Sequence, residues 1–379
     1  MALRGALPRI LALEAAAGQD LGKRGIDALK LPGALVGAAA VVAASRQPLV
    51  LTGFPCRLAD DPPTENDGPA GAAAIVRLCA RLGKSVTVAT DECNEPTVRA
   101  AAQVAWRQGG GFRSAGWLRV LAVAPPLPGD DASMDRAVSE CRGVAEGCDS
   151  VVAIERAGAT AGGSYLTMSG KSMDHLIAPL GEAARAVAAG RGAGSGPLDG
   201  RVVGVGDGGN ELGMGSVADL VRSSITNGEM IACVEPSDFL VVAGVSNWGG
   251  WAIAGAVEAL LASGPGGGEG ADGAAAGGAA AGTRTGGGGG GRSGLALAPE
   301  EALAASRSHV EVARCRGALP AGAPSLLPTD EEEREVMLAV AATGARDGVN
   351  GDDTASSCDN MPWSSTHLAV LAQMRACLA

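Results

Sequence analysis

The densest group of residues able to do chemistry lies at residues 202–215, where the sequence reads VVGVGDGGNELGMG. Its six glycines let the backbone adopt positive φ and let a ligand approach closely. Asp207, Asn210 and Glu211 supply two carboxylates and an amide. Such oxygen groups suit Mg²⁺ or Mn²⁺, and carboxylates also transfer protons once burial shifts their pKa. The same side chains could instead only cap a helix that follows a tight loop.

This segment also contains the GxGxxG pattern of dinucleotide-binding turns, at Gly204, Gly206 and Gly209. In such turns the glycines let a pyrophosphate approach the N-terminus of a helix. Asp207 would place a negative charge in the phosphate-facing turn, and only Glu229 loosely matches the expected ribose-binding acid. We therefore expect no nucleotide cofactor.

Two further segments place polar side chains where apolar runs end. Thr52 ends one run, and Asp67 precedes a helix that Pro69 could start, so Asp67 is either a metal ligand or a plain N-cap. Glu155 and Arg156 end another run. Glu155 could be a ligand or a base and Arg156 a carboxylate clamp, or both could form ion pairs with neighbouring elements.

A third segment, with Ser246 and Asn247, lies on a strand-to-helix turn beside Trp248 and Trp251. Ser246 and Asn247 could bind a substrate carboxylate or cap the helix. The turn does not fit the GxSxG pattern of a serine hydrolase. His367 follows a cap-like Ser/Thr run, and it could reach the site or only cap the last helix.

Short apolar runs alternate with longer alanine-rich stretches along the chain, which predicts a layered α/β domain with a largely parallel sheet flanked by helices. Ligands bind at the carboxyl ends of strands in such sheets, so we expect the polar segments to meet there. We expect strands at residues 48–52, 85–90, 118–124, 150–154, 202–205, 230–233 and 239–243. We expect helices at residues 71–82, 95–108, 134–146, 175–189, 211–224, 248–262, 299–314, 328–343 and 366–378.

The composition changes at residues 264–294, which contain 16 glycines. Such a segment cannot bury enough apolar area to offset the entropy lost on ordering, so we expect a disordered insertion in a surface loop. We assign residues 1–20 to an N-terminal extension, 21–263 to the first part of the α/β domain and 295–379 to its helical C-terminal part.

The overall composition limits which kinds of partner the protein can have. The 379 residues carry a formal net charge of −11, which argues against nucleic acid because its binding needs clustered Lys and Arg. No uninterrupted apolar stretch reaches the ~20 residues of a bilayer span, so we expect no membrane segment. Nine scattered cysteines without a CxxC pair suggest small buried hydrophobes in a reducing compartment. The compartment stays open between the cytosol and the mitochondrial or plastid matrix, and a homo-oligomer also stays open.

Taken together, the polar segments resemble the D-glutamate cyclase-like C-terminal domain family. The resemblance implies a small-molecule substrate, D-glutamate, which is converted to 5-oxo-D-proline and water. In animals the family's domain follows a second, N-terminal domain in a mitochondrial protein. The resemblance rests on residues 51–55, Asp67-Gly68-Pro69, residues 152–158, 204–215 and 243–250, and Thr366-His367, in that order.

The chemistry that the resemblance implies can be assigned to these residues. Cyclisation needs a neutral α-amine that attacks the γ-carboxyl carbon. Glu155 could be the base, and a divalent ion held by Asp207, Glu211 and Asp67 could polarise the γ-carboxylate. We assign substrate binding to Arg156, Asn210, Ser246, Asn247 and Thr52. A metal-dependent phosphatase and a non-catalytic ligand-binding module are the alternatives.

Overall fold

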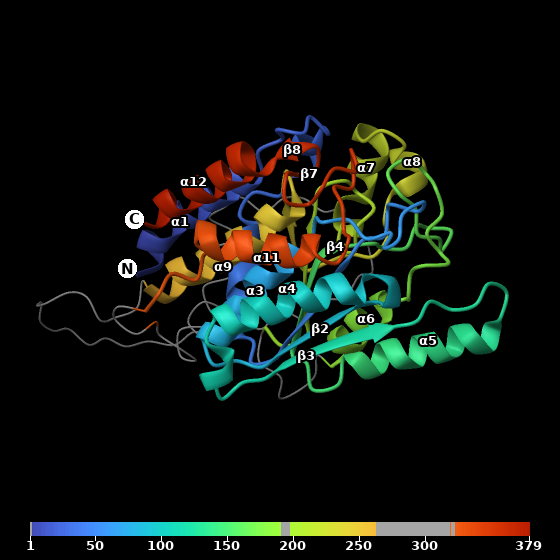
Figure 1. Ribbon diagram of the computed structural model, residues 1–379, viewed down its shortest axis with the longest axis horizontal. Helices are drawn as coiled ribbons and strands as arrows, with labels where there is room; N and C mark the ends of the chain where they lie inside the picture. The colour runs from blue at the N-terminus through green and yellow to red at the C-terminus, as the bar shows by residue number, and fades with distance from the viewer. Residues whose placement is uncertain (1, 191–197, 263–318, 320–322) are drawn as a thin grey trace, which may run out of the picture.

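The computed structural model describes residues 2–190, 198–262, 319 and 323–379 (Figure 1). The predicted insertion at 264–294 and the predicted helix at 299–314 lie outside the described residues.

A six-stranded sheet forms the centre of the molecule, with the strand order β3-β2-β1-β4-β5-β6. All neighbouring strands are parallel, which confirms the predicted layered α/β fold. Since parallel neighbours need crossover connections, helices cover both faces. The strands are β1 (Pro48–Gly53), β2 (Val86–Asp91), β3 (Leu118–Val123), β4 (Ser150–Arg156), β5 (Arg201–Gly206) and β6 (Phe239–Val242). A small antiparallel pair, β7 (Ser357–Cys358) and β8 (Met361–Pro362), lies in the C-terminal region.

Two hydrophobic cores lie on opposite faces of the sheet, because successive side chains of a strand point to opposite faces. On β1, Val50 joins the larger core and Leu49 and Leu51 join the smaller one. The larger core includes side chains of α1 (Ala2–Ala17), α2 (Ala34–Ala44), α3 (Pro69–Arg81), α4 (Glu95–Gln108), α9 (Ser246–Ala262), α11 (Asp330–Ala341) and α12 (Leu368–Leu378). The smaller core includes those of α5 (Asp131–Val144) and α6 (Gly181–Ala189).

The strand predicted at residues 230–233 is wrong. Gly228–Ile231 form the short helix α8, beside α7 (Ala218–Ser224). Ile231, Ala232 and Cys233 are buried in a third cluster, and a short apolar run can be buried as a helix as well as a strand. The other short elements are η1 (Ile26–Leu29), η2 (Glu92–Asn94), η3 (Gly111–Arg113), η4 (Gly215–Val217) and the π-helical turn η5 (Trp363–His367).

The N-terminal residues, assigned above to an extension, form helix α1, which packs against α9 and α12 (Figure 1). Ile10 and Leu13 of α1 are buried in the larger core. Neither α1 nor α2 coincides with a helix that we predicted from the sequence. The α2 segment is apolar all round, so it lacks the one-sided periodicity by which amphipathic helices are recognised.

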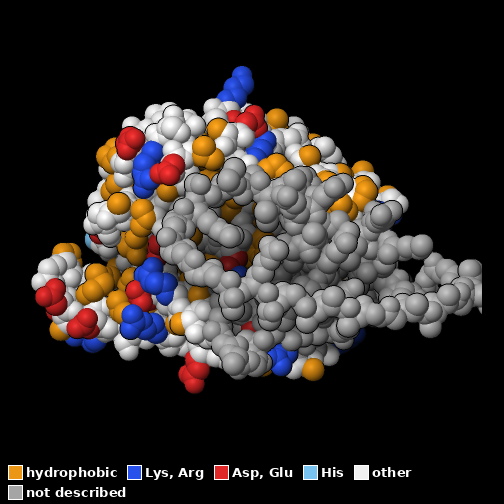
Figure 2. Space-filling view, turned by 180° about the vertical axis from the view of Figure 1, so that it is seen from behind, with side chains coloured by type: hydrophobic (Ala, Val, Ile, Leu, Met, Phe, Trp, Pro, Cys, Tyr) orange, Lys and Arg blue, Asp and Glu red, His pale blue; other side chains and the backbone are white. Residues whose placement is uncertain are grey.

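One face of the molecule carries both signs of charge. On the face in Figure 2, described Lys and Arg side chains lie among Asp and Glu side chains. Among the described residues, no helix combines the length and apolar character that a membrane crossing needs. All eight described cysteines are free thiols.

Helices α3 and α9 touch through two glycines. A Cβ atom added to Gly250 would lie 2.5 Å from the Cα atom of Gly71, closer than real side chains come. This contact brings the N-termini of both helices to the carboxyl ends of the central strands.

We expect Gly250→Ala to lower the free energy of unfolding by about 1–3 kcal/mol, because the added methyl group overpacks this contact. Gly143→Ala on α5 is the matched control, since its Cβ would meet open space. Alanine there should be neutral or stabilise by up to about 1 kcal/mol. Equal losses of stability in urea denaturation would contradict the close-contact interpretation.

A buried acid makes stability depend on pH. Glu333 on α11 is fully buried, and its Oε2 lies 3.9 Å from Nη2 of Arg77 on α3. Burial raises the pKa of Glu333 from its ordinary 4.5 to about 7, although the Arg77 charge opposes the rise. The protonated form therefore favours the folded state. This contribution is complete below pH about 4.5 and is lost as the pH rises through about 7.

Relative to Glu333→Gln, the wild-type chain should lose up to about 3 kcal/mol of unfolding free energy between pH 4.5 and pH 8. Urea denaturation of both proteins at several pH values measures the difference and removes the contribution of other titrating groups. Parallel pH profiles would refute the assignment to Glu333.

Candidate active site

A cavity of about 270 Å³ lies at the carboxyl ends of β1, β4 and β5. From β1 the chain adds β2 and β3 toward one edge of the sheet, and from β4 it adds β5 and β6 toward the other edge. Ligands bind at such a switch point in open α/β sheets. Five carboxylates and one cation line the cavity: Glu65, Glu155, Asp207, Glu211, Asp359 and Arg24.

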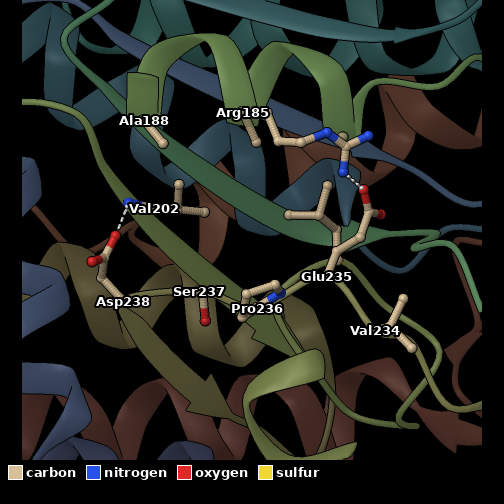
Figure 3. A pocket seen from close by; sticks show the side chains of 11 residues that line it. Arg185, Ala188, Val202, Val234, Glu235, Pro236, Ser237 and Asp238 are labelled. Carbon is tan, nitrogen blue, oxygen red and sulfur yellow. Dashed lines mark hydrogen bonds and ion pairs between the residues drawn. The ribbon is translucent and has the colours of Figure 1, made fainter. Parts of the chain in front are cut away.

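A larger cavity of about 380 Å³ lies beside α6 (Figure 3). Its charged groups already have partners. Arg185 pairs with Glu235 at 2.8 Å, and Asp238 accepts a hydrogen bond from the backbone amide of Val202 (Figure 3). We therefore place the chemistry at the smaller cavity, where buried carboxylate oxygens lack partners.

Glu155 is the extra residue of a bulge in β4. Thr52 is paired with Ile154 and Gly53 with Arg156, so Glu155 has no opposite residue. Its φ of 43° lies in the left-handed region, which costs a non-glycine residue about 1–3 kcal/mol. Bulges redirect side chains. Here the Glu155 carboxylate lines the cavity, and Oγ of Ser246 donates a hydrogen bond to its Oε2 at 2.6 Å.

Glu211 closes the glycine-rich loop after β5. Its Oε1 accepts hydrogen bonds from the amides of Asp207 at 3.2 Å and Gly208 at 2.7 Å, and its Oε2 accepts one from Gly209 at 2.7 Å. A phosphate in a dinucleotide-binding turn would use such amides. The loop instead binds its own carboxylate and holds Asp207 at the cavity.

Asp67 and Asn247 cap each other's helices. Asp67, which precedes α3, caps α9, and Asn247, which belongs to α9, caps α3. The Asp67 carboxylate accepts hydrogen bonds from the amides of Ser246 and Asn247 at the start of α9, both at 2.9 Å. Oδ1 of Asn247 accepts from the amides of Gly68 at 3.1 Å and Gly71 at 2.7 Å at the start of α3. Both side chains satisfy helix donors that would otherwise lack partners. Capping is an expected alternative for both residues, but each caps the other helix rather than the one that it begins or precedes. Asp67 also lies against the acids of the cavity.

Three charged residues of the cavity, Arg24, Glu65 and Asp359, are not among the predicted site residues, although Glu65 lies two residues before the predicted ligand Asp67. Arg24 precedes η1, and its Nη1 and Nη2 lie 2.5 Å from Oδ1 of Asp207 and 2.8 Å from Oδ1 of Asp359. Glu65 accepts a hydrogen bond from the Cys56 thiol at 3.2 Å. No strand end or motif marks these positions. The Asp359-Asn360 pair carries the one usable signal, since both types tolerate the positive φ that they adopt here.

Burial makes the cluster electrostatically unusual. It is the main cause that raises the pKa of Glu65, Asp67 and Glu155 well above their ordinary values, and neighbouring carboxylates add to the effect. The pKa of Asp359 is raised to about 7 for the same first reason. Burial also raises the pKa of Asp207, while Arg24 opposes the rise. Acids this close need protons or cations between them.

The acids form two triads that share Asp207. Asp67, Asp207 and Asp359 make one, Glu155, Asp207 and Glu211 make the other, and the oxygens within each triad lie within 4.8 Å of one another. Oδ2 of Asp207 and Oδ2 of Asp359 are buried without a hydrogen-bond partner. Such hard oxygen donors fit Mg²⁺ or Mn²⁺. The expected ligands Asp67 and Glu211 fall into different triads.

Arg156 points away from these acids and is not among the residues that line the cavity. Its buried guanidinium pairs through both terminal nitrogens with Asp91 at the end of β2, with Nη2 2.8 Å from Oδ1. Nη2 also donates to the carbonyl of Ala178 at 2.8 Å. The ion-pair alternative therefore describes Arg156, because the Asp91 carboxylate already binds both terminal nitrogens of its guanidinium group.

The remaining candidate residues lie in different surroundings, one on the cavity wall and two in the interior. Asn210 lines the cavity, and its Nδ2 donates to the carbonyl of Leu166 at 2.7 Å. Thr52 is buried beneath the site, with Oγ1 unpartnered. His367 lies in the core, where Nε1 of Trp248 donates to its Nδ1 at 2.9 Å, and its other ring nitrogen lies 3.0 Å from the carbonyl of Cys358. Burial lowers the pKa of His367, so it acts as a neutral support for the turn that carries Asp359.

The chain is similar to proteins of a known family. A family model described as D-glutamate cyclase-like, C-terminal, matches residues 13–375 of the chain. A human protein named D-glutamate cyclase, mitochondrial, is 34% identical over 259 residues. That match covers 65% of this chain and 38% of the human protein, so the chain corresponds to well under half of that relative.

If Arg156 is structural, Asp91→Asn should lower the free energy of unfolding by about 3–5 kcal/mol, because it leaves a buried guanidinium without a counter-ion. Asp219→Asn is the matched control. It breaks an ion pair of 2.6 Å with Arg222 in which Asp219 is 94% exposed, and it should cost under about 1 kcal/mol. A stable Asp91→Asn protein with weakened substrate binding would return Arg156 to the role of substrate clamp.

Proposed function

The chain belongs to the D-glutamate cyclase-like C-terminal family, and from this premise we propose that it converts D-glutamate to 5-oxo-D-proline and water. The observation that carries the proposal is the buried acid cluster at the switch point of the sheet. It contains a carboxylate, Glu155, that a strained bulge turns into the cavity.

The reaction makes two demands on the site. The α-ammonium group of D-glutamate must lose a proton before its nitrogen can attack the γ-carboxyl carbon. The new C–N bond then forms while a C–O bond breaks and water leaves. A cavity lined by acids attracts the ammonium group, but the two substrate carboxylates need positive charge beside them. Arg24 is the one cationic side chain among the residues that line the described cavity.

Glu155 meets the first demand. Burial raises the pKa of Glu155 well above its ordinary value, which makes its carboxylate a stronger proton acceptor than an ordinary glutamate. The hydrogen bond from Ser246 fixes its Oε2 and so orients the carboxylate. In the proposed reaction Glu155 takes a first proton from the α-ammonium group and passes it to the γ-carboxyl oxygen that departs. As the C–N bond forms, the same nitrogen loses a second proton, which Glu155 also passes to that oxygen, so that it leaves as water. Asn210 remains the proposed substrate contact on the cavity wall.

The second demand suits a divalent cation. Bound in one of the triads that share Asp207, it would supply a Lewis acid that polarises the γ-carboxyl group. The cyclase is favoured over a metal-dependent phosphatase, because Glu211 already occupies the loop amides that a phosphate would use. Among the compartments left open above, the name of the human relative favours the mitochondrion.

We expect the purified chain to form 5-oxoproline from D-glutamate with Mn²⁺ or Mg²⁺, measured by chromatography. Glu155→Gln should lower kcat by about 10²–10⁴-fold, because the amide cannot accept the proton. Glu140→Gln, which changes an exposed acid on α5, is the control and should match the wild-type rate.

A wild-type rate in Glu155→Gln would exclude Glu155 as the base. Phosphate release that EDTA abolishes, without 5-oxoproline, would indicate the phosphatase instead. Stabilisation by D-glutamate in a thermal melt without turnover would indicate a binding module.

A further inference from the structure

We propose that Asp67, Asp207 and Asp359 form a site for one divalent cation such as Mn²⁺ or Mg²⁺. The site's place in catalysis rests on the proposed function, whereas its binding of the cation can be measured separately. The proposal makes Asp359, from the C-terminal turn, a ligand in place of Glu211, whose carboxylate binds the amides of its own loop.

Asp207 and Asp359 divide their carboxylate oxygens in the same way. Each presents Oδ1 to Arg24, at 2.5 and 2.8 Å, and each leaves Oδ2 without a hydrogen-bond partner. The two side chains are only 3% and 4% exposed, and both line the cavity. A buried carboxylate oxygen without a donor is costly. A cation between the two Oδ2 atoms would supply the missing partner of both while Arg24 holds the opposite oxygens.

Asp67 provides the third donor in a fixed position. Its oxygens accept three hydrogen bonds from the amides of Gly68, Ser246 and Asn247, all at 2.9 Å. Each carboxylate oxygen can accept more than one partner, so a lone pair remains for a cation. Oxygens bound to Mg²⁺ at about 2.1 Å in octahedral geometry lie about 3–4 Å apart. The observed separations, all within 4.8 Å, allow such a site after small adjustments.

The second triad is the weaker candidate. Glu211 accepts three hydrogen bonds from loop amides, as Asp67 does from helix amides, and Oε2 of Glu155 accepts one from Ser246. The two triads therefore differ in how many of their oxygens lack a partner. Asp207 alone among that triad has a buried oxygen without a partner, whereas the first triad has two such oxygens. Placing the cation in the first triad also leaves Glu155 available for proton transfer.

The turn that carries Asp359 is built to aim it. Asp359 has a φ of 54°. The carboxylate of Asp347 accepts a hydrogen bond from the amide of Asn360 at 2.8 Å, and the His367 ring contacts the carbonyl of Cys358 at 3.0 Å. Both neighbours of Asp359 are therefore held in place. On the opposite side, Asp20 accepts a hydrogen bond from the Arg24 amide at 2.8 Å.

Charge gives a further reason. Among the described residues that line the cavity, five carboxylates, with Asp67 adjoining them, face a single arginine. D-glutamate brings two more carboxylates, which this field would repel. A bound divalent ion is often the largest local charge in such a site, and it would make the cavity able to accept an anionic substrate.

The test is a Mn²⁺ titration of the full chain after chelator treatment, with free Mn²⁺ followed by electron paramagnetic resonance. One Mn²⁺ should bind per chain, and Asp359→Asn should raise the Kd about 10–100-fold or more. Glu65→Gln is the matched control, because it removes one negative charge from the same cavity outside the triad. Its Kd should stay within about threefold of the wild-type value.

Failure to bind Mn²⁺ at millimolar concentration, or equal effects of the two variants, would overturn the site. If Asp359→Asn does not fold, cleavage of the wild-type backbone by bound Fe²⁺ with ascorbate and peroxide replaces it. Cuts should fall near residues 67, 207 and 359, and cuts elsewhere or none would overturn the proposal.

The same assays separate this proposal from the proposed function. Formation of 5-oxoproline that persists in EDTA, without Mn²⁺ binding, would remove the metal site and leave the cyclase. Mn²⁺ binding at the triad without 5-oxoproline would leave the metal site and remove the cyclase.

Discussion

The reciprocal capping of α3 and α9 is the interaction on which the site depends. Asp67 satisfies the first amides of α9, and Asn247 satisfies those of α3. The exchange is possible because Gly71 and Gly250 let the two helix backbones touch. Helix N-termini favour negative charge, so the same arrangement that anchors the helices makes a buried aspartate tolerable at the centre of the molecule. The other acids of the cavity gather around it.

Several features of the site oppose folding. Glu155 has a strained backbone, two aspartate oxygens lack partners, and burial raises the pKa of several acids. Local conflicts of this kind concentrate at functional sites and persist where the surrounding structure is well packed. Here a parallel sheet with a hydrophobic core on each face supplies that support. The buried pair of Arg156 and Asp91 ties the end of β4 to that of β2 beside the cavity.

Much of the fold follows from local pattern. The six strands of the sheet lie where continuous apolar runs predict them. The site is predictable to the extent that it follows strand ends, because parallel strands bring their carboxyl ends to one edge. Glu155 and Asp207 meet for that reason. Arg24, Glu65 and Asp359 could not be assigned in advance, because they come from loops whose paths depend on long-range contacts.

By itself, the sequence determined the alternation of strands and helices, the parallel sheet and the acids at the ends of β4 and β5. These depend on periodicity and residue type, which are local properties. Only the tertiary structure decided how each polar group is used. It filled the fork of Arg156 with Asp91, bound Glu211 to its own loop and brought Arg24 and Asp359 to Asp207. A charged side chain takes whichever partner the packed chain places within a few ångströms, and that choice is made by contacts between distant segments.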